Sequence, residues 1–315
     1  MEPTSPYKIE DFVDPKFIAD GTFSKVFRVT HAPTGKTYAL KKANKEVLMT
    51  LKVQDKDTYE YLDGIDLAHR EADVIKVLKD CPDMAPNFPE FVFGFEDDNY
   101  IYLFLELSEI GPPLDFDHQL ARYRPNPLFE PYRLPYLRQS FLQMARGLAG
   151  LHDLKVAHMD IKVENFLVFS GPNNTIKVKL IDFNSCRIFP KKCSLTSNQY
   201  GSLFYLPPEY YESLEGYSPF QADVYALGVV WFIMATTELP YTATKDPENE
   251  PFQDVVYEGN ITEQEVNLEG FRQPFRSLLA QMLAKDPTQR PTISEAIARL
   301  EVLDPAEPLV VSQSV

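Results

Sequence analysis

The chain has few of the features that mark secreted or membrane proteins. Its three cysteines, Cys81, Cys186 and Cys193, form no even set and no CxxC pair, which favours a reducing compartment. The longest strongly apolar run, residues 226–235, is about half the length that a membrane-spanning helix needs. The segment MEPTSPYKIEDF has neither the basic region nor the apolar core of a secretory signal. We therefore expect an intracellular protein, cytoplasmic or nuclear, with no membrane partner.

Positive charge is also scarce. The chain has 31 Lys and Arg against 46 Asp and Glu, for a formal net charge of −15. Nucleic-acid binding requires a basic surface, so this charge argues against nucleic acid as a main partner, and none is expected. The acidic balance would attract basic substrates over long range, but it would equally serve solubility alone. Both interpretations stay open.

Two acids and an amide stand at fixed offsets in the middle of the chain. HMDIKVEN occupies residues 158–165 and IDFN occupies residues 181–184, with two apolar segments between them that predict a hairpin. Asp160 is then a carboxylate that can meet a substrate hydroxyl. Asn165 and Asp182 offer the hard oxygen ligands that Mg²⁺ prefers, with water and phosphate supplying the rest. Phosphoryl transfer depends on this kind of positioning and charge neutralisation.

These strings resemble the motifs of eukaryotic protein kinases, whose catalytic loop reads HRDLKxxN and whose metal-binding motif is Asp-Phe-Gly. The resemblance runs in register from about residue 16 to residue 300. It implies ATP as phosphate donor, Mg²⁺ as cofactor and proteins as substrates. It also implies an α+β, bilobal fold, with a small antiparallel β-sheet N-lobe containing one main helix and a larger, mostly helical C-lobe.

The periodicity along the chain fits that fold. Alternating apolar residues predict strands over 16–43 and a hairpin over 91–107, and apolar spacing predicts a helix over 67–78. The Asp-rich segment 54–66 has loop character, and the proline-rich segment 108–136 is expected to be a surface connection. Further helices are predicted at 134–153, 218–236, 270–284 and 292–302.

A strand-rich part followed by a helix-rich part indicates two lobes, and SEIGPP at 108–113 interrupts the pattern between them. The expected organisation is an N-terminal extension at 1–11, a kinase domain at 12–303 with lobes at 12–107 and 108–303, and a tail at 304–315.

The string IADGTFSKVF resembles the kinase glycine-rich loop G-x-G-x-x-G-x-V, although on its own it would also fit an ordinary β-turn. Glycine serves in such loops because backbone N–H groups must approach phosphates closely. Of the three glycines only Gly21 is present, since Ala19 and Ser24 occupy the other positions, which predicts a stiffer loop. The resemblance assigns ATP contacts to Ile18, Ala19, Asp20, Gly21, Thr22, Phe23, Ser24, Lys25 and Val26, with Phe23 at the tip and Val26 against the adenine.

YALK resembles the strand motif V-A-I-K. By this resemblance Ala39 would sit above the adenine, and Lys41 would reach the α- and β-phosphates rather than being a solvated charge. Glu71 has the spacing of the acid in the family's third helix, and a pair with Lys41 would hold the lysine in place. We assign no role to the neighbouring His69 and Arg70. Glu106, Leu107 and Leu167 complete the ATP site, with Leu167 closing the adenine slot from below.

The resemblance also gives roles to the residues of HMDIKVEN. Asp160 would orient or accept the proton of the substrate hydroxyl, which contributes about 10²–10⁴-fold to the rate. Lys162 would neutralise the γ-phosphate, while Asn165 and Asp182 would coordinate Mg²⁺. The expected catalytic set is Asp160, Lys162, Lys41 and Glu71, whereas His158 and Phe183 are expected to pack.

Two positions depart from the family pattern. Met159 replaces the arginine that grips a phosphate on the activation loop, so activity is predicted not to depend on phosphorylation there. The loop hydroxyls that would lack their usual receiver belong to Ser194, Thr196, Ser197 and Tyr200. Asn184 replaces the glycine of Asp-Phe-Gly, where φ > 0 is expected. Asparagine adopts this conformation at a cost of roughly 1 kcal/mol or less.

GSLFYLPPE resembles the peptide-binding loop GTxxYxAPE. Ser202 would bond Asp160 and Lys162, and Glu209 would form a structural ion pair with Arg290. Asp223, in DVYALG, would hold the catalytic-loop backbone from behind.

The form DIKVEN points to Ser/Thr specificity. Glu164 could select a basic residue upstream of the acceptor, although Ile233 stands where a second acid often helps. Short strings, SKVF and KLIDF among them, echo the dual-specificity kinase of the spindle checkpoint, so dual specificity stays open.

Two other functions compete with an active protein kinase. A pseudokinase scaffold is suggested by the changes at Ala19, Ser24, Met159 and Asn184. A small-molecule kinase would share the H-x-D-x4-N loop but lack the PPE and DxYxxG block. Because the catalytic residues and that block are present, an active protein serine/threonine kinase is the preferred hypothesis.

Overall fold

The computed structural model describes residues 7–21, 24–108, 110, 130–171, 175–192, 194–198, 201–212, 216–236, 239–240, 243–245, 255–257 and 273–303. The chain divides into two compact units, one made of Met1–Pro113 with Leu167–Cys186 and the other of Leu114–Phe166 with Arg187–Val315. Several sequence predictions lie outside the described residues, namely those for Thr22, Phe23, Cys193, Tyr200, the tail 304–315 and most of the segment 108–129.

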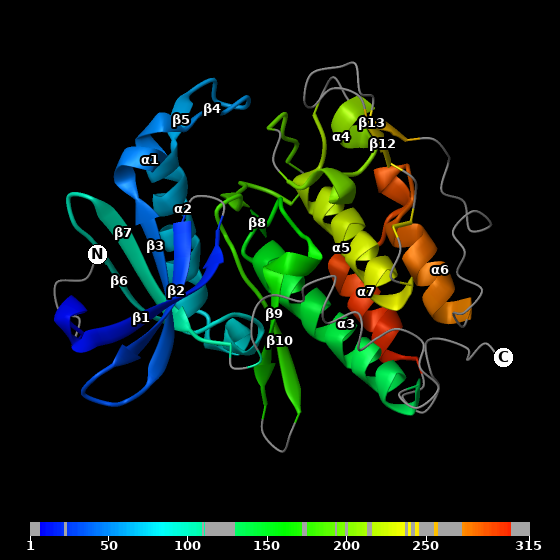
Figure 1. Ribbon diagram of the computed structural model, residues 1–315. Helices are drawn as coiled ribbons and strands as arrows, with labels where there is room; N and C mark the ends of the chain where they lie inside the picture. Colours follow the sequence, from blue (N-terminus) through cyan, green and yellow to red (C-terminus); the bar gives the residue numbers. More distant parts are fainter. Residues whose placement is uncertain are drawn as a thin grey trace. The chain divides into compact units, whose positions relative to one another are not determined.

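The first unit is built on an antiparallel five-stranded sheet of order β1-β2-β3-β7-β6 (Figure 1). Its strands are β1 (Phe12–Asp20), β2 (Ser24–His31), β3 (Thr37–Asn44), β6 (Phe91–Glu96) and β7 (Tyr100–Glu106). One face buries an apolar cluster that includes Val29, Leu40 and Phe104. Tyr7 and Phe12 pack against this cluster. The predicted strands and hairpin are confirmed, because alternate residues line opposite faces of the sheet.

Between β3 and the main helix the chain forms a short helix and a hairpin. These are α1 (Lys45–Thr50), β4 (Lys52–Gln54) and β5 (Tyr61–Asp63), followed by α2 (Gly64–Lys79). The prediction of loop character for 54–66 is wrong at its end, where β5 and the first turn of α2 lie. The reason is a capping box: Asp63 caps the first turn, and Asp66 bonds back to the Asp63 backbone.

The segment 167–186 belongs to the first unit by its contacts, although the predicted lobe boundary places it in the second. Its hairpin, β9 (Phe166–Ser170) and β10 (Ile176–Leu180), has the predicted pairing. Phe183 packs against Phe88 at 5.9 Å between ring centroids, beside the 3₁₀ helix η2 (Pro82–Asn87). Lys179 forms an ion pair with Glu106 at 2.5 Å. These contacts explain why the segment clusters with the strands.

Helices dominate the second unit (Figure 1). The principal helices are α3 (Glu130–Asp153), α5 (Pro219–Thr236), α6 (Gln273–Met282) and α7 (Ile293–Glu301). Residues 223–235 of α5 are all buried, as expected of a helix that is apolar on every side. Helix α5 contacts α3 and α6, and α3 contacts α7. Phe141 stacks on Trp231 at 5.0 Å and on Phe275 at 5.6 Å in the core between these helices.

The described residues of the second unit also form smaller elements. They are β8 (Val156–Ala157), η4 (Val163–Asn165), β11 (Arg187–Ile188), η6 (Leu203–Tyr205), α4 (Glu209–Glu212), β12 (Ala243–Lys245), β13 (Val255–Tyr257) and η7 (Pro287–Gln289), while η1 (Ile9–Asp11) precedes the sheet of the first unit. Helix α3 begins at Glu130, inside the segment 108–136 expected to be a connection and before the predicted helix start at 134, because proline is tolerated in a first helical turn.

The predicted α+β class, with an antiparallel sheet in the N-terminal unit and helices in the C-terminal unit, is confirmed. In the parts of the chain that the structure describes, no helix combines the length and the apolar content needed to cross a bilayer.

Candidate active site

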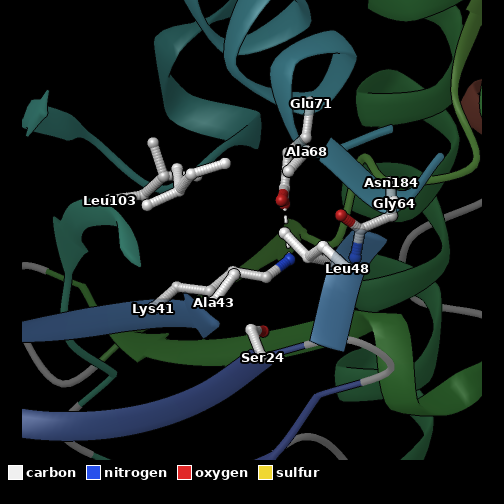
Figure 2. Close-up of a pocket in the computed structure, with 10 residues that line it drawn as sticks. Ser24, Lys41, Ala43, Leu48, Gly64, Ala68, Glu71, Leu103 and Asn184 are labelled. Carbon is white, nitrogen blue, oxygen red and sulfur yellow. Dashed lines mark hydrogen bonds and ion pairs between the residues drawn. The ribbon is translucent and has the colours of Figure 1, made fainter. Parts of the chain in front are cut away.

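In the first unit, Lys41 joins two acids from distant parts of the sequence. Its Nζ donates to Glu71 Oε1 at 2.6 Å and to Asp182 Oδ1 at 2.9 Å. Strand β3 supplies the lysine, helix α2 supplies Glu71, and the loop after β10 supplies Asp182. The contact with Glu71 is visible in Figure 2. The predicted Lys41–Glu71 pair is therefore present, and Asp182 extends it.

Local packing determines where this ion pair forms. Lys41 lies opposite Leu103 of β7 and Val26 of β2, so these three residues share one face of the sheet. Glu71 is on the buried face of α2 together with Leu67 and residues of the following turns. The side chains of Lys41 and Glu71 are 12% and 4% exposed. An ion pair this buried needs both partners, because a single buried charge is costly.

Electrostatics keep the lysine charged. Burial alone would lower the pKa of Lys41, but the carboxylates of Asp182 and Glu71 outweigh burial and raise that pKa. For Glu71, burial raises the pKa, Lys41 opposes the rise, and Asp182 adds to it. A permanent cation is what a lysine needs in order to bind phosphate oxygens.

The backbone at IDFN differs from the prediction. A positive φ was expected at Asn184, but the structure has φ = 65° at Asp182 instead, and Asn184 is not among the residues with positive φ. Asn184 has a different role, because its Nδ2 donates to Asp182 Oδ1 at 2.6 Å. An asparagine side chain readily forms such local bonds. The expectation of strain at Asn184 is therefore wrong, and this side chain helps to hold the Asp182 carboxylate.

A cavity adjoins the ion pair (Figure 2). Its empty volume is about 310 Å³, including space open to solvent. The lining is mainly apolar, with Ala43, Leu48, Ala68, Ile101 and Leu103, and also includes Ser24, Lys41, Gly64, Glu71 and Asn184. Ser24 Oγ is buried and has no hydrogen-bond partner in this structure. It leaves little room above Gly21, where an added Cβ would lie 2.8 Å from that oxygen.

The remaining predicted ATP contacts all lie in the first unit. Val26 and Ala39 share the sheet face of Lys41, because Val26 is paired with Lys41 and Ala39 is two residues away on β3. At the β1–β2 turn, Gly21 N donates to Ser24 O at 2.7 Å. The half-buried residues in this set are Ile18, Ala19, Val26, Ala39, Glu106, Leu107 and Leu167, and the exposed ones are Asp20, Gly21 and Lys25.

In the second unit, Asp160 accepts hydrogen bonds from Lys162, Asn165 and Ser202, of which the sequence predicted only the bond from Ser202. Lys162 Nζ donates to Asp160 Oδ2 at 2.7 Å, and Ser202 Oγ donates to Asp160 Oδ1 at 2.8 Å. Lys162 also donates to Ser202 Oγ at 3.1 Å. Asn165 Nδ2 donates to the Asp160 backbone oxygen at 2.7 Å and to Oδ2 at 3.3 Å. The contacts predicted for Ser202 are present, and the Asp160 carboxylate is held from several sides.

Asp223 fixes the backbone on which Asp160 stands. Its carboxylate accepts from His158 N and Met159 N, each at 2.8 Å, and contacts His152 Nε2 at 3.0 Å. Asp223 is 1% exposed, on the central helix α5. These bonds hold Met159 at φ = 63°, a conformation that side-chain-bearing residues adopt at a cost. The predicted support of the catalytic loop by Asp223 is observed.

The predicted ion pair between Glu209 and Arg290 is also observed. The two guanidinium nitrogens of Arg290 lie 2.6 and 2.7 Å from the two carboxylate oxygens of Glu209, a bidentate arrangement. The guanidinium also lies 4.8 Å from the ring centroid of Tyr225. Because the Arg290 side chain is fully buried, this pair supports the segment that carries Ser202.

Glu164 lies beside that segment. It is exposed, and Tyr205 Oη donates to Glu164 Oε2 at 3.5 Å. Burial, followed by the Glu164 carboxylate, raises the pKa of Tyr205, so this phenol stays protonated as a donor. Ile233 is buried in α5.

Met159 lies in an apolar cluster and not in a phosphate-binding position. It packs with Ala157, Phe189, Tyr217 and Phe220, all of them buried. This apolar cluster suits the thioether side chain of Met159 and would strongly disfavour a charged side chain at the same place.

The segment with the candidate phosphorylation sites is anchored by backbone pairing. Thr196 and Tyr217 exchange two backbone hydrogen bonds, each 3.0 Å long. Thr196 is 1% exposed, and its Oγ1 accepts from Asn198 N at 3.1 Å. Ser194 is half-buried and Ser197 is exposed.

Two residues to which the sequence analysis gave no role have specific partners. His69 Nε2 lies 3.2 Å from Glu96 Oε2, and Arg70 Nη2 lies 3.9 Å from Asp55 Oδ2. Both precede Glu71 on α2. Their partners lie far away along the chain, and only the position of these residues beside Glu71 could have drawn attention to them.

Comparison with known proteins adds a family assignment. Similar proteins include hormonally up-regulated neu tumor-associated kinase homolog A of Xenopus laevis, 30% identical over 89% of this chain and 36% of the relative. Calcium-dependent protein kinase 27 of Arabidopsis thaliana is 26% identical over 88% of this chain and 51% of the relative. Serine/threonine-protein kinase PKH1 of Saccharomyces cerevisiae is 27% identical over 93% of this chain and 35% of the relative.

The chain thus spans between about a third and a half of the length of these relatives. Its residues 12–300 match the protein kinase domain family. This match covers both units and every residue of the Lys41 and Asp160 groups, so the chain belongs to the protein kinase domain family.

Proposed function

We propose that this chain transfers the γ-phosphate of ATP to serine and threonine hydroxyls of protein substrates, with Mg²⁺ as cofactor. The observation that carries the proposal is the hydrogen-bonded group at Asp160. Its carboxylate already accepts a hydrogen bond from one serine hydroxyl, that of Ser202, at 2.8 Å, and so has the chemistry to accept one from a substrate. The name of the yeast relative, a serine/threonine-protein kinase, supports the same substrate class.

The residues available for Mg²⁺ suit that ion. Mg²⁺ binds through one or two protein oxygens together with water and phosphate. Asp182 offers a carboxylate, and Asn165 uses only its amide nitrogen in its two bonds to Asp160, which leaves the amide oxygen for a metal. Among the described residues no group of three or more His, Cys, Asp or Glu forms a metal cage. When bound by Asp182 and Asn165, Mg²⁺ would neutralise charge on the phosphates.

The proposed reaction divides its tasks among four side chains. Lys41, kept cationic by its two carboxylates, holds the α- and β-phosphates, and Glu71 holds Lys41. Asp160 orients the substrate hydroxyl and takes its proton as the bond from oxygen to the γ-phosphorus forms. The bond from that phosphorus to the bridging oxygen breaks and leaves ADP. Lys162 neutralises charge on the transferred group. Such charge neutralisation, together with positioning, supplies most of the catalysis in phosphoryl transfer.

We further propose that this activity does not need a phosphate on the activation segment. Met159 packs in an apolar cluster with Phe189 and Tyr217, so the segment is held by hydrophobic contacts rather than by a phosphate receiver. Removal of phosphate by a phosphatase should leave the rate unchanged, and loss of activity after that treatment would contradict this part of the proposal.

Substrate preference follows from the surface charge. Glu164 is an exposed carboxylate beside the Ser202 segment, and the chain carries a net charge of −15. Both favour substrates with basic residues near the acceptor. Transfer to tyrosine as well, which would mean dual specificity, is a second outcome of the peptide-library assay described below.

A nucleotide-binding scaffold without transfer is the second candidate function. The observation in its favour is that Lys41 and Asn184 both donate to the same oxygen of Asp182. A metal ion must therefore bind through the other carboxylate oxygen or displace one of these donors. Binding of nucleotide would survive this competition better than transfer would.

The test is a kinase assay on the purified chain with Mg-ATP and a mixed peptide library. We expect phosphate on Ser and Thr, and an Asp160→Asn variant should be slower by about 10²–10⁴-fold. Asp153→Asn serves as the control, because Asp153 forms an exposed surface pair with Lys192. Nucleotide binding without transfer would favour the scaffold, and equal rates for Asp160→Asn and the unmodified chain would refute the assigned role of Asp160.

A further inference from the structure

Three consecutive residues of α2 each contact a different element of the first unit. Their partners come from strand β6, from the loop that joins β4 to β5, and from strand β3. The pairs, by their closest atoms, are His69–Glu96 at 3.2 Å, Arg70–Asp55 at 3.9 Å and Glu71–Lys41 at 2.6 Å.

Helix geometry gives this arrangement its meaning. Successive side chains of an α-helix project about 100° apart, so three in a row cover about 200° of its circumference. Rotation of α2 about its axis must then stretch at least one of the three contacts. The contacts at positions 69 and 70 therefore restrain the direction in which Glu71 points.

The contact from Asp55 comes from a carboxylate that its own loop holds in place. The Asp55 side chain is 3% exposed, and its Oδ1 accepts from Asp57 N at 3.0 Å and Thr58 N at 3.1 Å. The other carboxylate oxygen faces Arg70. A buried carboxylate is stable only when its charge is balanced and its oxygens are bonded, and the Arg70 guanidinium, 3.9 Å away, supplies a balancing charge for Asp55.

The contact from Glu96 also involves helix α1. Its Oε2 lies 3.1 Å from Lys45 Nζ at the start of α1 and 3.2 Å from His69 Nε2. Burial raises the pKa of Glu96, but the bonds from His69 and Lys45 outweigh burial and lower it. Glu96 thus links the sheet, α1 and α2 through one carboxylate.

Close packing adds a restraint at the start of α2. A Cβ on Gly64 would lie 2.8 Å from the backbone oxygen of Leu48 and 2.9 Å from its Cα. Leu48, a residue of α1, is fully buried and belongs to a cluster that includes Ala68 of α2. Helix α1 therefore touches the backbone of α2 directly, and translation of α2 toward α1 is blocked.

We infer that Asp55 and Glu96 are positioning residues for the Lys41–Glu71 pair. They hold α2, through Arg70 and His69, in the rotation that brings the Glu71 carboxylate to Lys41. The inference rests on the proposed function, because the pair matters for rate only if the chain transfers phosphate. The contacts described above connect both residues to α2, so we assign their effect to the position of Glu71.

A double-mutant cycle on the full chain tests this inference. Asp55→Asn and Glu96→Gln are each assayed alone and in a Glu71→Gln background, with kcat and the KM for ATP measured on a serine peptide. Each is expected to lower kcat about tenfold in the native background and less than about twofold when Glu71 is already changed. Asp73→Asn is the control, because Asp73 pairs with Lys76 on the exposed side of α2.

Hydrogen exchange of α2 amides provides a measurement that does not need turnover. We expect faster exchange across residues 68–75 in Asp55→Asn and Glu96→Gln than in Asp73→Asn. Equal kcat losses in both backgrounds would overturn the inference, since they would indicate general destabilisation, and so would unchanged exchange. An inactive unmodified chain would refute the proposed function, and the exchange comparison would still decide the placement of α2.

Discussion

The Lys41 group of the first unit and the Asp160 group of the second are held in contrasting ways. Asp160 sits on a loop whose backbone N–H groups bond to Asp223, a residue of the buried helix α5. Lys41 instead depends on Glu71, whose helix is restrained by ion pairs with neighbouring elements as well as by its buried face. The Asp160 group is thus held by hydrogen bonds to a buried helix, whereas the Lys41 group is held by side-chain contacts between separate elements. Damage to the first should therefore cause the larger loss of stability, and damage to the second should cause a smaller loss of stability together with a lower rate.

The largest effect is expected from Asp223→Asn. One carboxylate oxygen becomes an NH₂ group that faces backbone N–H donors, so a buried donor loses its acceptor. We expect the free energy of unfolding to fall by about 2–4 kcal/mol, measured by urea denaturation. The exposed Asp153→Asn variant should remain within experimental error of the unmodified chain. An Asp223→Asn variant of undiminished stability would contradict the idea that α5 anchors the catalytic loop.

A smaller effect is expected from Gly64→Ala. In an uncrowded helix this change would stabilise by roughly 0.5–1 kcal/mol, but here the new methyl group would meet the Leu48 backbone. We expect a net destabilisation of about 1–3 kcal/mol from overpacking, together with a lower kcat because α2 must shift. Urea denaturation and the peptide assay measure the two effects. A gain in stability would show that α1 and α2 can separate freely.

The smallest effect is a pH dependence at Glu96. Its pKa is lowered below the ordinary value of 4.5, so the ionised form favours the folded state. Its contribution is present above about pH 4.5 and is lost as the pH falls through the lower folded pKa. The melting temperature of Glu96→Gln should therefore fall below that of the unmodified chain at pH 7, and the gap should narrow below pH 4. Because Lys45 and His69 contact this carboxylate, the difference in melting temperature between the unmodified chain and Glu96→Gln should be present at neutral pH.

Glu46→Gln provides the matched control for the loss of one negative charge, because Glu46 is exposed on α1. Its melting temperature should differ little from that of the unmodified chain at either pH. A gap for Glu96→Gln that is the same at pH 7 and below pH 4 would argue against the ionised carboxylate as its cause.

Contacts between residues that belong to motifs of fixed order could be predicted from the sequence. The pairing of Lys41 with Glu71, and of Ser202 with Asp160, could be predicted because each residue lies in a string with a fixed order along the chain. The partners of His69 and Arg70 could not, since a lone acid in a loop or at a strand end carries no local signal of its long-range contact. Such contacts depend on how α1 and the β4–β5 hairpin pack.

The backbone at Asp182 shows a second limit. Sequence comparison located the unusual residue, Asn184, and placed the positive φ there. The structure has that conformation two residues earlier, with the Asn184 amide bonded to the Asp182 carboxylate. Which of the two residues has the positive φ depends on side-chain hydrogen bonds. The amino acid at one position of a motif does not reveal those bonds.

The bridge between Thr196 and Tyr217 has a consequence for mass spectrometry. The Thr196 hydroxyl is enclosed and its backbone is paired in both directions, so a modifying enzyme can reach it only after this stretch has opened. Phosphothreonine at this position would therefore show that the segment opens locally while a kinase and ATP are present, and its rate of appearance would measure how often that happens.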